Sequence, residues 1–195
     1  MTTAAIDDTS WPVSTRRRLL DAAMNLFSQY SFAGTSLQMI ADELDLTKAA
    51  IYYHFRTREE LLIALMGPIL TEIGAVVEAA EGKRGARARA EAMLTGYADI
   101  VARNRSLAAV TAFDPSVRAV LRNQPKWSAV IDRQLALLAG TDSAVSGAIN
   151  AAVVLTGLAG AASIAPRRLD DGTLRTHLVD VGRRTLGLPG PARHR

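Results

Sequence analysis

The chain has 195 residues, of which 49% are hydrophobic, 22% charged and 5% aromatic. This is the composition of a globular protein of one domain or two small ones, and the absence of cysteine excludes disulfides, thiolate zinc sites and cysteine nucleophiles. The net charge of +4 does not by itself indicate nucleic acid, because residues 1–65 carry six Lys and Arg against eight Asp and Glu. The apolar residues are mostly Ala, Leu and Val with few β-branched runs, which favours an all-α fold.

The N-terminal end of the chain is polar and acidic. Residues 1–13 have neither the basic nor the apolar region of a signal peptide, so we predict a disordered arm there. Apolar residues at helical spacing then predict the first helix over about residues 15–30. Arg16, at the start of this helix, opposes the helix dipole, and nearby phosphates would offset that unfavourable charge.

Two capping boxes follow the first helix. The box from Thr35 to Gln38, in which the threonine caps and the glutamine reaches back, predicts the start of a short second helix. Thr47 is expected to cap a short third helix over about residues 48–54, and the box from Thr57 to Glu60 starts a longer fourth helix. Three helices, the last two short and separated by a tight turn, are typical of a helix-turn-helix unit.

Proline and glycine divide the rest of the chain. Gly67-Pro68 is expected to break or kink the fourth helix, which resumes to about residue 80, because proline removes a backbone donor and clashes with the preceding turn. We hypothesise that this kink lets motion pass along the helix, with a static break as the alternative. Further helices are predicted over about residues 86–103, from Pro115, from Pro125 to Gly140, over 143–166 and over 171–186, which makes about nine in all.

The helix predicted over residues 143–166 contains no charged residue and is long enough to cross a bilayer. It consists mostly of Ala, Gly and Ser and includes Asn150 and Thr156, so its tendency to insert into a membrane is weak. A buried helix fits better, and a symmetric dimer would cover it on most sides.

The third helix presents an unusual face. Ile51 and Phe55 lie one turn apart and must point to the core, which leaves two alanines on the opposite side among aromatic and basic residues. Small side chains let a helix approach base edges, where alanine contacts thymine methyl groups and Lys48 reaches a guanine acceptor or a phosphate. A chance surface patch is the alternative, but the position between two capping boxes favours DNA. The candidate DNA-binding residues are Arg16, Thr35, Ser36, Thr47, Lys48, Ala49, Ala50, Tyr52, Tyr53, His54 and Arg58.

The segment from Gly34 to Leu62, GTSLQMIADELDLTKAAIYYHFRTREELL, resembles the DNA-binding signature of the TetR family of bacterial transcriptional regulators. The strong resemblance covers about residues 15–65, and the rest of the chain is similar only in length and helix layout. Many members of the family have glycine where this chain has Ala49. That difference brings one methyl group toward the DNA.

The resemblance implies a cytoplasmic homodimer in which a small molecule bound to the C-terminal domain moves the fourth helix and releases DNA. In the family the last two helices of each subunit usually form a four-helix dimer interface, and most members repress a gene. We accordingly expect a disordered arm at residues 1–13, a helix-turn-helix DNA-binding domain at 14–58, a helical ligand-binding and dimerisation domain at 59–187 and a flexible tail at 188–195.

Apolar and aromatic residues of the C-terminal helices are candidates to line the effector site, with plain core as the alternative for each: Met66, Leu70, Met93, Leu94, Tyr97, Phe113, Leu121 and Trp127. As a group they indicate a mostly apolar effector, which Tyr97, Thr111, Asn123 or Gln124 could orient. We find no arginine cluster that would suggest a phosphorylated effector. Small residues and an apolar stripe give the candidates for the dimer interface: Gly157, Gly160, Ala161, Leu174, Leu178 and Val181.

Signals of catalysis and of metal binding are absent from the sequence. There is no serine elbow, no paired-carboxylate motif and no ligand spacing, and His54, His177 and His194 are scattered. We therefore expect no enzyme activity, metal or cofactor. The expected partners are a palindromic operator of double-stranded DNA, a small-molecule effector and a second copy of the chain, without a membrane. A small-molecule-binding helical enzyme and a membrane-associated helical protein are the alternatives.

Overall fold

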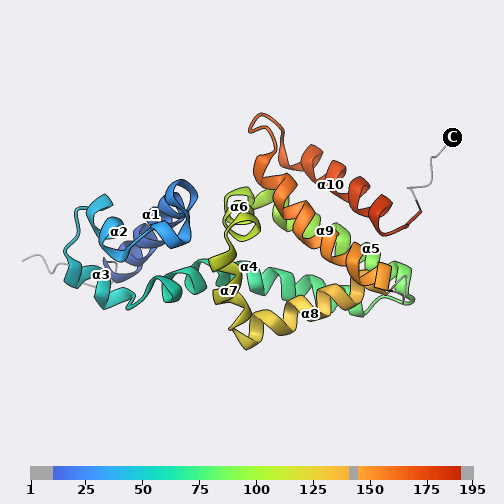
Figure 1. The fold of residues 1–195 in the computed structure, drawn as a ribbon, viewed down its shortest axis with the longest axis horizontal. Helices are drawn as coiled ribbons and strands as arrows, with labels where there is room; N and C mark the ends of the chain where they lie inside the picture. Colours follow the sequence, from blue (N-terminus) through green and yellow to red (C-terminus); the bar gives the residue numbers. More distant parts are fainter. Residues whose placement is uncertain (1–10, 141–144, 190–195) are drawn as a thin grey trace, which may run out of the picture. The chain divides into compact units, whose positions relative to one another are not determined.

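Figure 1 shows a computed structural model of the chain, which describes residues 11–140 and 145–189, with side chains from residue 15 onward in these ranges. The described residues form ten α-helices and no strand, which confirms the all-α prediction. The helices are α1 (Trp11–Gly34), α2 (Leu37–Glu43), α3 (Lys48–His54), α4 (Arg58–Glu81), α5 (Ala86–Arg103), α6 (Arg105–Phe113), α7 (Pro115–Arg122), α8 (Pro125–Ala139), α9 (Val145–Ile164) and α10 (Asp171–Thr185).

The chain divides into two compact units, residues 1–65 and 66–195, so the first residues of α4 belong to the N-terminal unit. The predicted boundary at residues 58 and 59 lies slightly earlier in α4. Within the predicted disordered arm, residues 11–13 are the start of α1 and residues 1–10 lie outside the described part. The predicted flexible tail is described only at residues 188 and 189, which follow the last helix.

One helix was missed in the prediction of about nine. The stretch after α5 forms a separate helix, α6, because Asn104 leaves helical geometry at φ −120° and ψ 45°. Its side-chain amide donates to the carbonyl of Ile100 at 2.8 Å, and its backbone amide donates to the same carbonyl at 3.1 Å, so both donors of Asn104 cap the end of α5. Neither glycine nor proline lies at this break, so the sequence contained no helix-breaking residue that would have predicted it.

The N-terminal unit is a small three-helix core closed by the start of α4. The long first helix is interrupted at Ser31, whose φ of 64° and ψ of 166° are not helical, so the regular part ends at Tyr30 as predicted. Helix α2 packs on both α1 and α3. The fully enclosed side chains are apolar and come from all four segments: Leu19, Ala23, Phe32, Ile40, Ala41, Ile51, Leu61 and Leu62.

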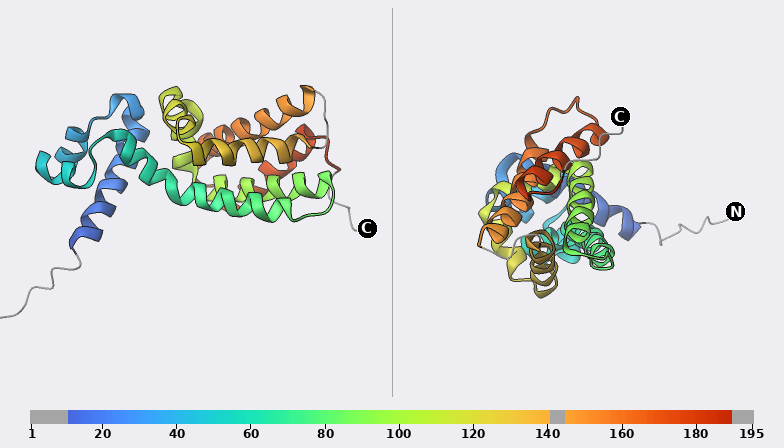
Figure 2. Two further views of the ribbon diagram at one scale, coloured as in Figure 1. Left: turned by 90° about the horizontal axis from the view of Figure 1, so that it is seen from below. Right: turned by 90° about the vertical axis from the view of Figure 1, so that its right-hand side faces the viewer.

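In the C-terminal unit, α5 packs against α8, α9 and α10, and α9 also packs against α6, α8 and α10. Helices α9 and α10 lie side by side (Figures 1 and 2). Close approach of α10 to α5 depends on Gly182, because a Cβ added there would overlap the side chain of Leu94. The buried positions Gly182 and Leu94 thus set the distance between these two helices.

Helix α4 is continuous from Arg58 to Glu81 and contains Pro68 in its interior. A break at this proline is therefore excluded, and the alternative of a kink stays a prediction. Proline lacks the amide hydrogen that would bond to the preceding turn, and the helix tolerates this loss because Ile69 and Ile73, after it, are buried and anchor the following turns. The role of this position in transmitting motion stays a hypothesis.

Candidate DNA-binding surface and ligand cavity

Helix α3 begins at a defined cap and buries one side. The hydroxyl oxygen of Thr47 accepts a hydrogen bond from the amide of Ala50 at 3.2 Å, which confirms the predicted cap. Ile51 and Phe55 are buried in the core of the N-terminal unit, as their spacing predicted. The opposite face is consequently turned to solvent, and Tyr53 on it is 83% exposed.

The exposed face of α3 combines small, aromatic and basic side chains. Ala49 is exposed and Ala50 half-buried, so the centre of the face carries no bulky group. The ammonium of Lys48 lies 5.7 Å from the centre of the Tyr52 ring, and the Tyr53 ring meets the ring of His54 edge-on at 5.1 Å. These contacts orient the long side chains beside the alanines without covering them.

Two of the predicted DNA-binding side chains, those of Thr35 and Arg58, form hydrogen bonds inside the N-terminal unit. Thr35 is buried, and its hydroxyl donates to the carbonyl of Ser31 at 2.8 Å. The N-cap of α2 is the next residue, Ser36, which accepts from the amide of Met39 at 3.1 Å. The predicted capping box is therefore wrong by one residue, because the Thr35 hydroxyl is used by the end of α1. Gln38 likewise bonds forward to Asp42 rather than back to a cap.

Arg58 acts as a clamp within the N-terminal unit. One guanidinium nitrogen donates to the carbonyls of Phe32, Ala33 and Thr35 at 3.1, 2.9 and 2.9 Å, and the group lies 5.0 Å from the centre of the Phe32 ring. Its donors thus satisfy the carbonyls that end α1. These hydrogen bonds engage the guanidinium inside the unit, and the contact of Arg58 with DNA stays a prediction.

The remaining basic residue of the prediction, Arg16, is exposed on α1 and stacks on the ring of Phe55 at 5.1 Å. This contact brings a cation from the start of α1 to the end of α3 inside the same unit. Ser36 and Thr47 are also exposed, and their hydroxyl hydrogens remain able to donate because each oxygen only accepts in its cap.

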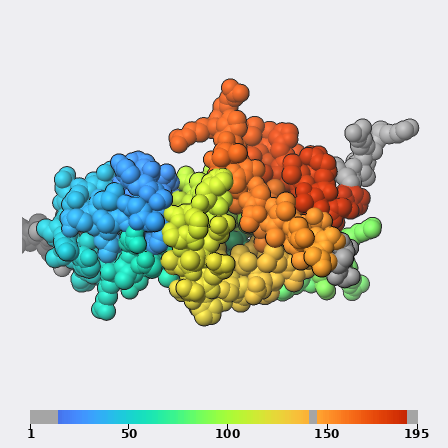
Figure 3. Space-filling model, viewed as in Figure 1, coloured from blue at the N-terminus to red at the C-terminus, as the bar shows by residue number. Residues whose placement is uncertain are grey.

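A cavity of about 520 Å³ lies within the C-terminal unit, and Figure 3 shows the hollow between α7, α8 and α9. Its wall is mostly apolar, as in typical small-molecule sites. Four predicted residues line it, namely Met66, Tyr97, Leu121 and Trp127. The apolar lining is completed by Ile69, Ile73, Ile100, Val101, Leu107, Ala108, Ala112, Ile131, Leu135, Leu155 and Ala159.

Four other predicted residues do not line this cavity. Leu94 packs against α10 at Gly182, and Met93 beside it is fully buried. Phe113 is 62% exposed, with its ring near Gly160, and Leu70 is half-buried on α4. Met93 and Leu94 belong to the ordinary core, which helical spacing cannot distinguish from the wall of a cavity.

Sequence reasoning missed the charged part of the lining. Arg118 and Arg122 of α7 and Asp132 of α8 line the cavity, together with Asn104, Ser128 and Thr156. The signal was present in α7, where Val117 and Leu121 are buried and the arginines four residues apart share another face. Of the polar residues predicted to orient an effector, Tyr97 and Thr111 line the cavity, whereas Asn123 and Gln124 do not.

Tyr97 connects α5 to α9 at the cavity wall. Its hydroxyl donates to the carbonyl of Leu155 at 2.9 Å. Burial raises the pKa of the Tyr97 hydroxyl well above its ordinary value, so the group is neutral at physiological pH. Tyr97 therefore lines the cavity as a neutral, hydrogen-bonded side chain and does not act as an acid or a base.

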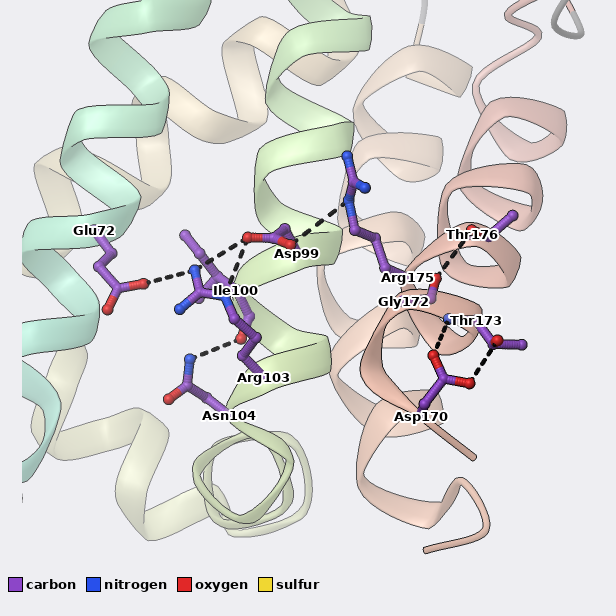
Figure 4. A network of polar contacts seen from close by, with 10 residues as sticks. All are labelled: Glu72, Asp99, Ile100, Arg103, Asn104, Asp170, Gly172, Thr173, Arg175 and Thr176. Carbon is purple, nitrogen blue, oxygen red and sulfur yellow. Dashed lines mark hydrogen bonds and ion pairs between the residues drawn. The ribbon is translucent and has the colours of Figure 1, made fainter. Parts of the chain in front are cut away.

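Outside the cavity, a chain of charges joins α4, α5 and α10 (Figure 4). Arg103 donates to Glu72 and to Asp99, both at 3.1 Å, and Asp99 also pairs with Arg175 at 3.6 Å. All four side chains are partly exposed, so each pair by itself contributes little stability. Together they hold α4 beside α5, and both helices line the cavity.

Within the described residues, an apolar surface along α9, together with Val181 of α10, is left uncovered. Its large exposed residues are Val145, Ile149, Val153, Ile164 and Val181. Gly157 and Ala161, predicted for the dimer interface, are exposed on α9, while Gly160 is half-buried.

Two leucines predicted for the dimer interface lie elsewhere. Leu174 and Leu178 are each only 4% exposed, in the protomer's own core. Helix α10 packs against both α5 and α9 within the protomer, and its most apolar side is used there. These leucines therefore have little surface left for a second protomer, and their burial argues against the predicted role in a dimer interface.

Two helices, Arg58–Glu81 and Val145–Ile164, are long and apolar enough to cross a membrane, a test that core helices of soluble proteins also pass. In α9 the contacts with four neighbouring helices account for its apolar inner side. Among residues 11–140 and 145–189, no group of three or more metal-ligating side chains comes together.

Residues 19–65 match the family described as bacterial regulatory proteins, tetR family. The transcriptional repressor KstR2 of Rhodococcus jostii (strain RHA1) is 27% identical over 125 residues, which are 64% of this chain and 60% of KstR2. The transcriptional regulator RutR of Escherichia coli (strain K12) is 38% identical over 74 residues, or 36% of this chain and 35% of RutR. The similarity thus spans less than two thirds of either relative.

Solved structures extend the likeness of fold to almost the whole chain. A tetR-family protein from Rhodococcus RHA1 has a TM-score of 0.66 at 19% identity, over 90% of this chain and 98% of that one. The ketosteroid transcriptional regulator KstR2 of Mycobacterium tuberculosis has a TM-score of 0.65 at 16% identity, over 96% and 97%. Residues 19–65 thus match the tetR family of bacterial regulatory proteins, the named relatives are transcriptional regulators, and the fold of almost the whole chain is similar to that of solved tetR-family proteins.

Proposed function

We propose that this chain is a homodimeric transcriptional repressor of the bacterial cytoplasm, which binds a palindromic operator and releases it when a small molecule binds. The observation that carries the proposal is the exposed face of α3, where Ala49 and Ala50 stand among Lys48, Tyr52 and Tyr53. A monomeric soluble protein gains nothing from exposing such a face, whereas the major groove matches it.

Each part of this face has a role on DNA. The two alanines let α3 enter the major groove, and the methyl group of Ala49 contacts thymine methyl groups. Lys48 and Tyr53 reach base edges or phosphates at either side. Ser36, Thr47 and Arg16 hold the backbone, because hydroxyls, cations and helix N-termini bind phosphate oxygens.

Dimerisation is supported by the uncovered face of α9 and α10. Val145, Ile149, Val153 and Ile164 recur along one side of α9, and Gly157 among them permits close approach of a second helix. An isologous contact through this face would relate two copies of α3 by a two-fold axis. The half-sites of the operator should then be inverted repeats one helical turn apart or a multiple of it.

The response to a ligand is supported by the cavity and by the continuity of α4. Met66, Ile69 and Ile73 of this helix line the cavity, and the same helix begins within the N-terminal unit at Arg58. A molecule in the cavity therefore contacts the helix that leads into the DNA-binding unit. The relative from Rhodococcus jostii is named a transcriptional repressor, which supports repression here.

The test is selection of bound duplexes from a random pool with the full chain at fixed near-physiological salt. Recovery of an inverted repeat is expected and would support a dimeric, sequence-reading regulator. Salt-sensitive binding without sequence preference would contradict operator recognition, since phosphate contacts alone produce it. Absence of binding by a folded dimer would contradict the proposal altogether.

A further inference from the structure

The inner wall of the cavity offers few free hydrogen-bond donors. The hydroxyls of Tyr97, Thr111 and Thr156 donate to backbone carbonyls at 2.9, 3.0 and 2.8 Å. The amide of Asn104 likewise donates to the carbonyl of Ile100 at 2.8 Å. The hydroxyl of Ser128 donates to the carbonyl of Arg122 at 2.7 Å. Apart from the charged residues of α7 and α8, the rest of the lining is aliphatic or aromatic, so the inner cavity suits an uncharged, apolar body.

Free cationic donors are concentrated on one lining helix. Arg118 and Arg122 of α7 lie four residues apart, and both line the cavity and are exposed. Elsewhere in the C-terminal unit, Arg103, Arg133 and Arg183 are each paired with a glutamate. Within the described residues, by contrast, neither arginine of α7 has a carboxylate partner.

The lining also contains one acidic side chain, Asp132 of α8, which is exposed and forms no ion pair among the described residues. Two guanidinium groups against one carboxylate leave this part of the lining positive. A guanidinium binds carboxylate or phosphate oxygens through two parallel hydrogen bonds. Among the described residues, no carboxylate forms such bonds with Arg118 or Arg122.

We propose that the effector is an amphipathic organic anion, with an apolar body inside the cavity and a carboxylate or phosphate group held by Arg118 and Arg122. This inference rests on the proposed effector function of the cavity and gives its chemical class. The sequence analysis found no arginine cluster, whereas the structure places two arginines of α7 in the wall of the cavity.

The test is calorimetry of the full chain with four twelve-carbon probes: dodecanoate, dodecyl phosphate, 1-dodecanol and dodecylammonium, each below its micelle concentration. One or both anions should bind about tenfold or more tightly than the alcohol, and dodecylammonium most weakly. Comparison of dodecanoate with dodecyl phosphate identifies which anionic group the arginines prefer.

Variants then assign the preference to the arginines. Arg118→Ala with Arg122→Ala should weaken binding of the anions about tenfold or more and leave 1-dodecanol unchanged. The matched control is Arg84→Ala with Arg87→Ala, which removes the same charge from exposed positions outside the cavity. Asp132→Asn should strengthen binding of the anions. The reversal Arg118→Glu with Arg122→Glu should make dodecylammonium the preferred probe.

Equal binding of dodecanoate and 1-dodecanol would overturn the proposal, and so would anion binding that the Arg118 and Arg122 variants leave unchanged. Absence of binding by all four probes would also overturn it, because a cavity of about 520 Å³ with apolar walls should accept a twelve-carbon chain. These measurements require no DNA. A failure to find an operator and a failure to find this ligand class can therefore be told apart.

Discussion

Arg58 illustrates how a single residue can have a role other than its charge suggests. Its guanidinium reaches three carbonyls at the end of α1, which no water would satisfy as well in this partly buried position. Arginine suits the role because its planar group presents several donors in a fixed geometry, whereas lysine presents one compact ammonium.

Arg58→Ala should therefore destabilise the N-terminal unit by about 1–3 kcal/mol, measured by urea unfolding, because three carbonyls lose the guanidinium and that of Phe32 keeps only the amide of Thr35 at 3.4 Å. Arg58→Lys should restore only part of this stability. Arg56→Ala, at an exposed neighbouring position, is the control and should leave the midpoint unchanged. If Arg58→Ala unfolds like the parent but loses DNA binding, Arg58 is a phosphate contact after all.

Tyr53 is the most exposed aromatic residue of α3, and its proposed role is to read bases. Tyr53→Ala should change the selected operator sequence, with altered discrimination of roughly 1–3 kcal/mol for each misread base pair. Lys48→Ala is the comparison: it should weaken binding to all sequences and lower the salt slope by about one. Unchanged selectivity in Tyr53→Ala would exclude this tyrosine as a base reader.

At the scale of helices, the contact of α10 with α5 depends on the absence of a side chain at Gly182. Gly182→Ala should destabilise the C-terminal unit by about 1–3 kcal/mol, because the new methyl group overlaps Leu94 in a closely packed core. Gly74→Ala, with no atom near its added Cβ, is the control and should be neutral or slightly stabilising. Thermal unfolding of both variants measures the difference. Equal stability would show that α10 shifts freely on α5.

The start of α10 makes stability depend on pH. The Asp170 carboxylate accepts from the amide of Thr173 at 2.9 Å and from its hydroxyl at 2.7 Å, and these hydrogen bonds hold the pKa of Asp170 below its ordinary value of 3.8. The folded state then binds this proton less readily than the unfolded state. The contribution is complete above pH 3.8 and is lost as the pH falls below it.

Asp170→Asn should accordingly flatten the loss of stability on acidification, as followed by urea unfolding between neutral pH and pH 3. Asp132→Asn, which replaces an exposed carboxylate without an ion pair among the described residues, is the comparison and should retain the acid dependence. The same pH dependence in parent and Asp170→Asn would mean that other carboxylates dominate it.

At the scale of the whole molecule, the exposed apolar face of α9 and α10 is the proposed dimer interface. Ile149→Glu with Val153→Glu should yield a folded monomer that no longer binds the palindromic operator, since charge in a buried interface is costly. Light scattering after gel filtration measures the mass. Leu178→Ala should instead destabilise each protomer, because Leu178 is part of its own core. A dimer that survives both glutamates would place the interface elsewhere.

Local signals were sufficient for the helix-turn-helix. The cap at Thr47, the buried pair Ile51 and Phe55 and the short helices around them were all predicted and are confirmed. Each depends on hydrogen bonds and side-chain spacing within a few residues, and such local features can be predicted from the sequence alone. Asp114 and Asp170 cap α7 and α10 through hydrogen bonds that are equally local.

The sequence by itself therefore determined the helical class, most helix boundaries and the exposed face of α3. Only the tertiary structure decided that Arg58 clamps α1, that Leu174 and Leu178 face inward, and that two arginines of α7 line the cavity. Spacing along a helix tells which residues share a face. Which partner that face meets depends on packing between segments far apart in the chain, and one helix can offer two apolar sides to two different neighbours.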